Sequence, residues 1–274
     1  ASHTNLVGFK PSRGRVPRGD GLPPIFLDFE VAGPIARSVD DAAAVMQVIG
    51  RGAAPPEAAR PARILFIPRF GNHPVDPQIA ALTATAADRL AALGHAVSTA
   101  QHFELAEAIN QRWALLAQVG LAWLVAHPQE LSRRPFDPSL FGPAMQANAE
   151  AGRKASASEL FELLFEAERL RVGLSRLFEQ YDYLLTPAAA ALPWPADQTH
   201  PPRIDGREVG PRGHAVFAGF VNAVGLPAIA LPCGFAEGMP VGLQLVAAEG
   251  ADDALLALAR SFEQAHPWLR FPSA

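Results

Sequence analysis

Residues 222–245 read NAVGLPAIALPCGFAEGMPVGLQL, and this stretch decides the fold class. A helical segment that starts near His214 is predicted to stop at Gly225, because glycine readily adopts the backbone conformation that ends a helix. The apolar runs 228–231 and 241–245 then predict two strands around the turn Gly238-Met239-Pro240. The stretch therefore indicates sheet structure that directly follows a helix.

Upstream of this stretch, apolar runs alternate with helical periodicity. Residues 64–67 predict a buried strand, Asp76-Pro77 begins a helix that ends at Gly94, and residues 96–98 return as a strand. Further elements are predicted as follows: a helix after the capping-box-like pair Ser38 and Asp41, helices over 105–126, 158–180 and 252–265, and a strand over Tyr183–Pro187 that precedes a Pro-rich loop through Pro202. Residues 1–34, rich in Gly, Pro and Arg, are predicted to be loop-dominated. The pattern predicts one α/β architecture with a mixed, largely parallel sheet flanked by helices.

Composition and charge narrow the class of function. Of 274 residues, 49% are hydrophobic and 18% are charged, which predicts a large buried core. The formal net charge of −4, without long runs of one sign, offers no electrostatic footprint for nucleic acid or an anionic membrane. Cys233 is the only cysteine, so an intrachain disulfide framework is excluded. The first residues do not resemble a secretory signal and no apolar run would span a bilayer, so we expect a cytoplasmic protein without nucleic-acid or membrane partners.

Several common catalytic motifs are missing. The nearest match to a Gly-x-Ser-x-Gly elbow, residues 173–177, lacks the second glycine and falls inside a predicted helix. The eight histidines show no i, i+4 pair, and no phosphate-binding glycine motif is present, so neither a metal nor another cofactor is expected. Cys233 ends a predicted strand, where a nucleophile could sit, although a buried apolar role suits a lone cysteine better. Lys10, between Phe9 and Pro11, is interpreted as a packing or solvated lysine.

Three segments together resemble the amidase signature family. They are LVGFKPSRGRVP at 6–17 with GPIARSV at 33–39 and Asp41, LLTP at 184–187, and the stretch 222–245 quoted above. Their order and spacing, together with the closing Pro267-Trp268, are also similar to the family pattern. The resemblance implies the amidase signature fold, incomplete in this chain, and hydrolysis of a linear carboxamide to a carboxylic acid plus ammonia or an amine.

The resemblance also implies that the catalytic group lies elsewhere. Members of the family use a serine nucleophile, a second serine in a cis peptide and a lysine, the Ser-Ser-Lys triad. The nucleophile loop of the family runs Gly-Gly-Ser-x-Arg-x-Pro-Ala, and its last alanine resembles Ala1. No residue of this chain matches the triad, so we expect residues 1–274 to be the C-terminal portion of a single amidase signature domain. Its partner would be the N-terminal portion of the same amidase, as a separate chain or an upstream segment.

The chain is then expected to supply the acyl and leaving-group pocket, since pockets of α/β proteins form beyond the carboxyl ends of strands. The substrate-binding candidates are Thr186, Pro187, Leu192, Trp194, Phe217, Asn222 and Cys233, although a packing role suits each of them better than contact with a ligand. Family members that act on a tRNA-linked substrate carry an acidic residue seven positions before the Asn of this Asn-x-x-Gly motif. Ala215 stands there, which favours a small neutral amide.

Two other functions compete with a divided amidase. The chain could be a non-catalytic interaction subunit with an amidase-like scaffold, and would then fold cooperatively by itself. It could also be an enzyme that uses Cys233 with a histidine. The sequence does not distinguish an amide from a carbamate or an ester as the substrate, because hydrolysis of all three proceeds by acyl transfer. Whether the protein forms a homodimer also stays open at this point.

Overall fold

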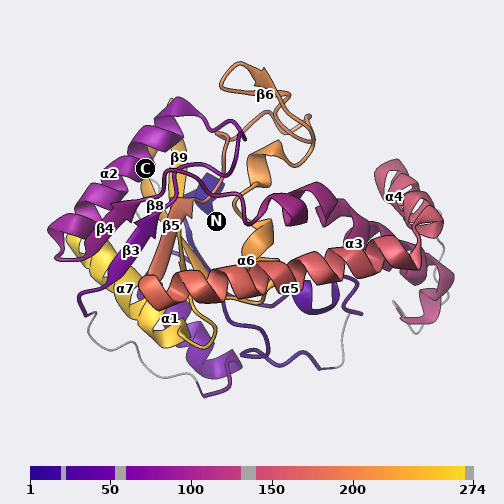
Figure 1. Ribbon diagram of the computed structural model, residues 1–274, viewed down its shortest axis with the longest axis horizontal. Helices are drawn as coiled ribbons and strands as arrows, with labels where there is room; N and C mark the ends of the chain where they lie inside the picture. The colour runs from indigo at the N-terminus through magenta and orange to yellow at the C-terminus, as the bar shows by residue number, and fades with distance from the viewer. Residues whose placement is uncertain (20–22, 53–59, 131–139, 269–274) are drawn as a thin grey trace.

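The computed structural model describes residues 1–19, 23–52, 60–130 and 140–268. They build a seven-stranded sheet in the order β2-β1-β8-β9-β5-β3-β4, surrounded by helices (Figure 1). The strands are β1 (Val7–Lys10), β2 (Ile35–Ala36), β3 (Arg63–Phe66), β4 (Ala96–Thr99), β5 (Tyr183–Pro187), β8 (Ala228–Ala236) and β9 (Met239–Ala247). The predicted α/β fold, with a mixed sheet flanked by helices, is therefore confirmed.

The sheet is less parallel than predicted. β3 pairs in parallel with β4 and β5, whereas β1–β2, β1–β8, β8–β9 and β5–β9 are antiparallel. The tight turn between β8 and β9 makes these neighbours antiparallel, since only a longer crossover could join parallel strands. The expectation of a largely parallel sheet is thus corrected for the described residues: it holds only for the β5-β3-β4 part.

The N-terminal segment also differs from its prediction. Within residues 1–34, predicted to be loop-dominated, β1 pairs with β8 through Gly8 and Ala230 and buries Val7 and Phe9. This short strand of alternating burial contains Gly8, and its pairing depends on a segment more than 200 residues away. Local sequence therefore gave little sign of it.

The described residues form seven α-helices. They are α1 (Val39–Ile49), α2 (Pro77–Ala92), α3 (Glu107–Ala126), α4 (Pro143–Lys154), α5 (Ala157–Gln180), α6 (Gly219–Ala223) and α7 (Asp252–Ala265). Two predicted helix starts are confirmed: the side chain of Ser38 accepts from the Asp41 amide, and that of Asp76 accepts from two amides of the first turn of α2. The predicted helix from His214 to Val224 is instead split into a 3₁₀ turn, Gly213–Ala215, and the short α6.

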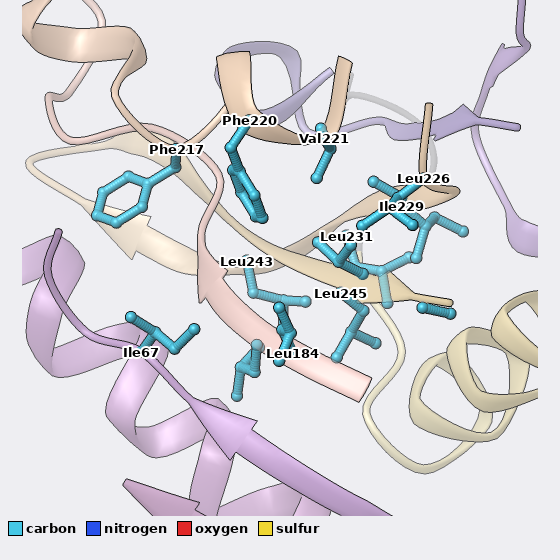
Figure 2. Packing of buried hydrophobic residues seen from close by; sticks show 14 of the residues in the cluster. Ile67, Leu184, Phe217, Phe220, Val221, Leu226, Ile229, Leu231, Leu243 and Leu245 are labelled. Carbon is cyan, nitrogen blue, oxygen red and sulfur yellow. The ribbon is translucent and has the colours of Figure 1, made fainter. Parts of the chain in front are cut away.

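The helices fall into two groups, one packed on the strands and one packed mainly on other helices. α2 and α7 pack against β8 and β9, and α1 packs against α7 and β1. α3 contacts α4, α5 and α6, and α3 and α4 extend away from the sheet in Figure 1. Figure 2 shows Phe220 and Val221 of α6 directed toward Leu231 and Leu243 of the sheet. Among the described helices, none combines the length and apolar character needed to cross a bilayer.

Candidate functional site

The carboxyl ends of β3, β4 and β5 meet at one edge of the sheet, and the segments that follow them are tied together there. The Gly71 amide donates to the Phe103 carbonyl at 2.8 Å, and the Asp76 amide donates to the Ala190 carbonyl at 2.9 Å. The Ala190 amide in turn donates to the His214 carbonyl at 2.9 Å. Gly71 has a φ of +46°, which a residue with a side chain adopts only with strain. Segments distant in sequence are thereby fixed beside one another.

An aromatic cluster joins these segments through their buried side chains. The ring of Phe70, just beyond β3, lies with its centroid 4.5 Å from Phe103, 4.8 Å from Phe217 and 5.2 Å from Phe220. Phe70, Phe217 and Phe220 are almost completely buried. Burial of an aromatic side chain contributes on the order of 2–3 kcal/mol, and tilted ring pairs add to it. The cluster therefore gives the loops a rigid base.

A buried polar contact joins β5 to the segment ahead of α6. Gln244 of β9 donates through Nε2 to Thr186 Oγ1 at 3.1 Å and to the Phe217 carbonyl at 2.9 Å. Thr186 donates to the Pro187 carbonyl at 2.8 Å. Because buried polar groups require partners, this arrangement holds the end of β5 and the backbone of Phe217 at a defined separation.

Aromatic and imidazole rings lie beside the end of β5. His3 Nε2 is 3.2 Å from the Ala191 carbonyl, and its ring makes an edge contact with Trp194 at 5.6 Å between centroids. Trp194 also packs against His214, with centroids 4.6 Å apart. Burial lowers the pKa of His3 and of His214, and the positive charge of Arg212 lowers the pKa of His214 further. Neutral imidazoles at this position can accept or donate hydrogen bonds to an uncharged ligand.

A cleft of about 760 Å³ lies near His214, since Gly213 and Val216 on either side of it are among the lining residues. Its wall consists of the loop after β3, the start of α3, and the segment from the β6–β7 hairpin (Arg203–Ile204 and Arg207–Glu208) to Val216. Asn110 of α3 donates through Nδ2 to the Val216 carbonyl at 2.9 Å, which anchors that segment. The cleft lies beyond the carboxyl ends of the parallel strands, the usual place for a ligand in an α/β protein.

The seven predicted substrate-binding residues fall into separate environments. Thr186, Pro187, Phe217 and Cys233 are buried, whereas Leu192, Trp194 and Asn222 are partly exposed. Gln244 links Thr186 to the backbone of Phe217, and Trp194 contacts the two histidines. None of the seven is among the residues that line the cleft. Their role in binding substrate stays a prediction.

The thiol of Cys233 is poorly suited to nucleophilic chemistry. It donates to the Val241 carbonyl at 3.5 Å, and burial raises its pKa to about 12. In the described part of the chain, no serine or cysteine side chain is hydrogen-bonded to a lysine or a histidine. Lys10 lies at the far end of β1, where its Nζ donates to the Pro11 carbonyl at 3.2 Å. The described residues therefore contain no assembled nucleophile and base of this kind.

Sequence reasoning missed several residues of this edge. His3 and His214 appeared only as scattered histidines, and Asn110, His73 and Arg212 belonged to no motif. Some of these residues follow a predicted strand or precede a predicted helix, and that position could have marked them as candidates for the carboxyl edge of the sheet. No local spacing, however, indicates that residues more than 180 positions apart, such as His3 and Ala191, lie in contact.

Comparison with known proteins gives consistent matches. A family model described as Amidase matches residues 1–256. The putative amidase AmiC of Mycobacterium leprae is 32% identical, and the alignment covers 98% of this chain and 60% of that protein. The 6-aminohexanoate-cyclic-dimer hydrolase of Paenarthrobacter ureafaciens is 31% identical, with 98% of this chain and 61% of that protein covered.

Solved structures agree with the sequence matches. A structure of 6-aminohexanoate cyclic dimer hydrolase complexed with substrate superimposes with a TM-score of 0.83 at 27% identity, covering 98% of this chain and 62% of the other. This chain spans about 60% of the length of the relatives it matches.

Proposed function

This chain belongs to the amidase signature family, and from that membership we propose that it forms the pocket-bearing part of a serine-dependent amide hydrolase. The proposed reaction converts a carboxamide to a carboxylic acid plus ammonia or an amine. The serine nucleophile, the second serine and the lysine would be supplied by sequence upstream of Ala1. Residues 1–274 would then be the C-terminal portion of one amidase signature domain.

The observation that carries this proposal is the position of the first residues. Ser2–Thr4 form a 3₁₀ turn packed against β9, and His3 of that turn contacts the loop after β5. In the family pattern the nucleophile precedes the alanine matched by Ala1 by five residues. A nucleophile loop that joins the chain at this point would enter beside Trp194 and His214, at the carboxyl end of β5.

The residues present would bind and orient the amide. The rings of His3, Trp194 and His214 offer an apolar surface with hydrogen-bonding nitrogens, and Gln244 holds the strand end beneath them. Ala215, half-buried beside His214, supplies no carboxylate to pair with a substrate amino group. This supports a substrate without a cationic group near the scissile bond.

Exposed apolar side chains favour a partner. Phe161, Phe165 and Val172 of α5 are 69%, 47% and 51% exposed, and Val48 of α1 is 85% exposed. Apolar surface of this kind is a common feature of interfaces. It suits the remaining portion of an amidase, and it equally suits the second candidate function, a non-catalytic interaction subunit.

The test begins with the intact masses of every polypeptide in a preparation of the protein from its natural source. Hydrolysis of a panel of amides, esters and carbamates is then compared between that material and residues 1–274 alone. We expect hydrolysis only where a polypeptide with the upstream lysine and Gly-Gly-Ser segment is present, and loss of hydrolysis on Ser→Ala in that segment. Hydrolysis by residues 1–274 alone would refute the claim that the catalytic triad lies outside this chain. A complex without hydrolytic activity would favour the second candidate function, a non-catalytic interaction subunit.

A further inference from the structure

The cleft beside the ring cluster contains charged groups that the proposed hydrolysis does not use. Three carboxylates and two guanidinium groups are among its lining residues: Glu104, Glu107, Glu208, Arg207 and Arg212. Their pairing decides what kind of ligand the cleft can hold, because a buried charge requires a partner of opposite sign.

Two of the three carboxylates already have partners. Glu107 accepts from His73 Nε2 across 2.9 Å and from Gln111 Nε2 at 2.8 Å. Glu208 forms an ion pair with Arg203 at 3.2 Å. Glu104 is exposed to solvent at the rim. The carboxylates of the cleft are thus engaged with other groups or hydrated, and none contacts Arg212 among the described ion pairs.

Arg212 is held in place without a carboxylate partner. Its Cζ lies 5.0 Å from the centroid of the Trp113 ring of α3. The side chain is partly buried, and this burial lowers the pKa of its guanidinium group. Stacking on an indole orients the planar fork and leaves its N–H donors free to bind a planar anion. Arg207 is different, since its Nη1 donates to the Asn72 carbonyl at 2.6 Å and its side chain is exposed.

The cleft is adjacent to the place where hydrolysis is proposed. Arg212 immediately precedes the turn Gly213–Ala215, and His214 of that turn packs against Trp194. Arg212 of the cleft wall and His214 of the ring cluster are therefore two residues apart on one segment.

We propose that Arg212 binds a carboxylate at the remote end of the substrate, so that the substrate is an amide with a carboxylate several carbons from the scissile bond. The hydrolysis of such a substrate rests on the proposed amidase function, whereas the binding of a carboxylate by Arg212 does not. A carboxylate fits the bidentate geometry of guanidinium, with its two oxygens matching two parallel N–H donors. The sequence favoured a small neutral amide, whereas this proposal makes the substrate anionic at the end remote from the scissile bond.

Binding is tested first with the intact protein, using hexanoate and its uncharged analogue hexan-1-ol as probes in ligand-observed NMR titrations. We expect wild type to bind hexanoate more tightly than hexan-1-ol. Arg212→Gln should weaken hexanoate binding about 10- to 100-fold, the range for loss of hydrogen bonds to a charged group. Arg212→Lys should restore part of the loss, because ammonium keeps the charge without the fork. Arg153→Gln, which removes an equal charge from the exposed face of α4, is the control and should change neither affinity.

Equal affinity of wild type for the two probes would overturn the proposal without reference to any variant. Hexanoate affinity that is unchanged in a folded Arg212→Gln protein would also overturn it. Phosphate is included as a third probe, and tighter binding of phosphate than hexanoate at Arg212 would contradict the carboxylate assignment.

Hydrolysis separates this proposal from the proposed function. Adipamate and hexanamide have the same chain length and differ in the remote carboxylate. In the assembled enzyme, Arg212→Gln should lower kcat/KM about 10-fold or more for adipamate and leave hexanamide unaffected. If no amide is hydrolysed by any preparation, the proposed function fails, while the hexanoate titrations still decide the role of Arg212.

Discussion

Gln244 and Thr186 share a hydrogen bond of 3.1 Å between adjacent strands, and the same Gln244 amide group donates to the Phe217 carbonyl at 2.9 Å. Both residues are buried, so water cannot readily replace either contact. One side chain therefore couples the end of β5 to the segment that leads into α6.

Replacement of this amide should destabilise the protein. Gln244→Leu leaves the Phe217 carbonyl without this donor, and we expect the free energy of unfolding to fall by about 1–3 kcal/mol. Thr186→Val removes only the hydroxyl and should cost less, because Gln244 keeps its bond to Phe217. Urea denaturation of both single variants and of the double variant measures the two effects. The double variant should cost less than the two single changes together, since both disrupt one contact. If the losses in free energy of unfolding are strictly additive, the hydrogen bond between Gln244 and Thr186 contributes nothing to stability.

A second buried contact ties the N-terminal segment to α7. Ser12 Oγ donates to Asp252 Oδ2 at 2.5 Å and accepts from the Gly250 amide at 2.9 Å, and the Ser12 amide donates to Asp252 Oδ1 at 2.8 Å. Ser12→Ala should lower the free energy of unfolding by about 1–3 kcal/mol, because buried partners lose their hydrogen bonds. Asp253→Asn is the matched control on the neighbouring residue. Its ion pair with Arg15 is partly exposed, and its loss should cost at most about 1 kcal/mol. Thermal or urea unfolding measures both variants. Equal losses of stability in Ser12→Ala and Asp253→Asn would contradict a stabilising role for the buried Ser12–Asp252 contact.

Lys10 should make stability depend on alkaline pH. Burial lowers the pKa of Lys10 from 10.5 to about 8, against the opposing attraction of Asp252. Between these values the unfolded chain binds more protons than the folded one, so the free energy of unfolding increases as pH rises from about 8 to 10.5 and the cost of burying a protonated amine is relieved. The full gain is at most about 3 kcal/mol.

Lys10→Met removes this titration. The difference in the free energy of unfolding between wild type and Lys10→Met should therefore grow in favour of wild type as pH increases through this window. Lys154→Met, at an exposed position on α4, serves as the control and should leave the pH dependence unchanged. A constant difference across the window would show that Lys10 titrates normally.

Cys233 should react slowly with thiol reagents. Because burial raises its pKa to about 12, little thiolate exists at pH 8 in the folded protein. We expect labelling by a disulfide reagent to be at least about 100-fold slower in native protein than in urea. In the assembled enzyme, Cys233→Ser should retain most of the activity. Rapid native labelling, or loss of activity in a folded Cys233→Ser protein, would instead favour a cysteine-dependent enzyme.

Much of the secondary structure could be predicted from local signals. The caps at Ser38 and Asp76 begin α1 and α2 as expected, and the apolar run that ends at Pro187 forms β5. The strand β1 was not predicted, because it forms by pairing with β8, more than 200 residues away. The helix predicted from His214 was wrong in its extent, since it is interrupted before α6. The antiparallel pairing of β9 with β5 likewise joins strands far apart in the sequence, and the strand-helix-strand pattern did not reveal it.

The sequence by itself determined the fold class, the family and the position of most helices, because capping residues, glycines and apolar periodicity act over a few residues. It also placed Thr186 and Pro187 at a strand end. Only the tertiary structure decided that His3, Trp194 and His214 form one ring cluster and that Arg212 lies on Trp113 without a carboxylate. These contacts join segments that are far apart along the chain. They exist because burial of the aromatic core brings the loops together, a long-range effect that no local pattern encodes.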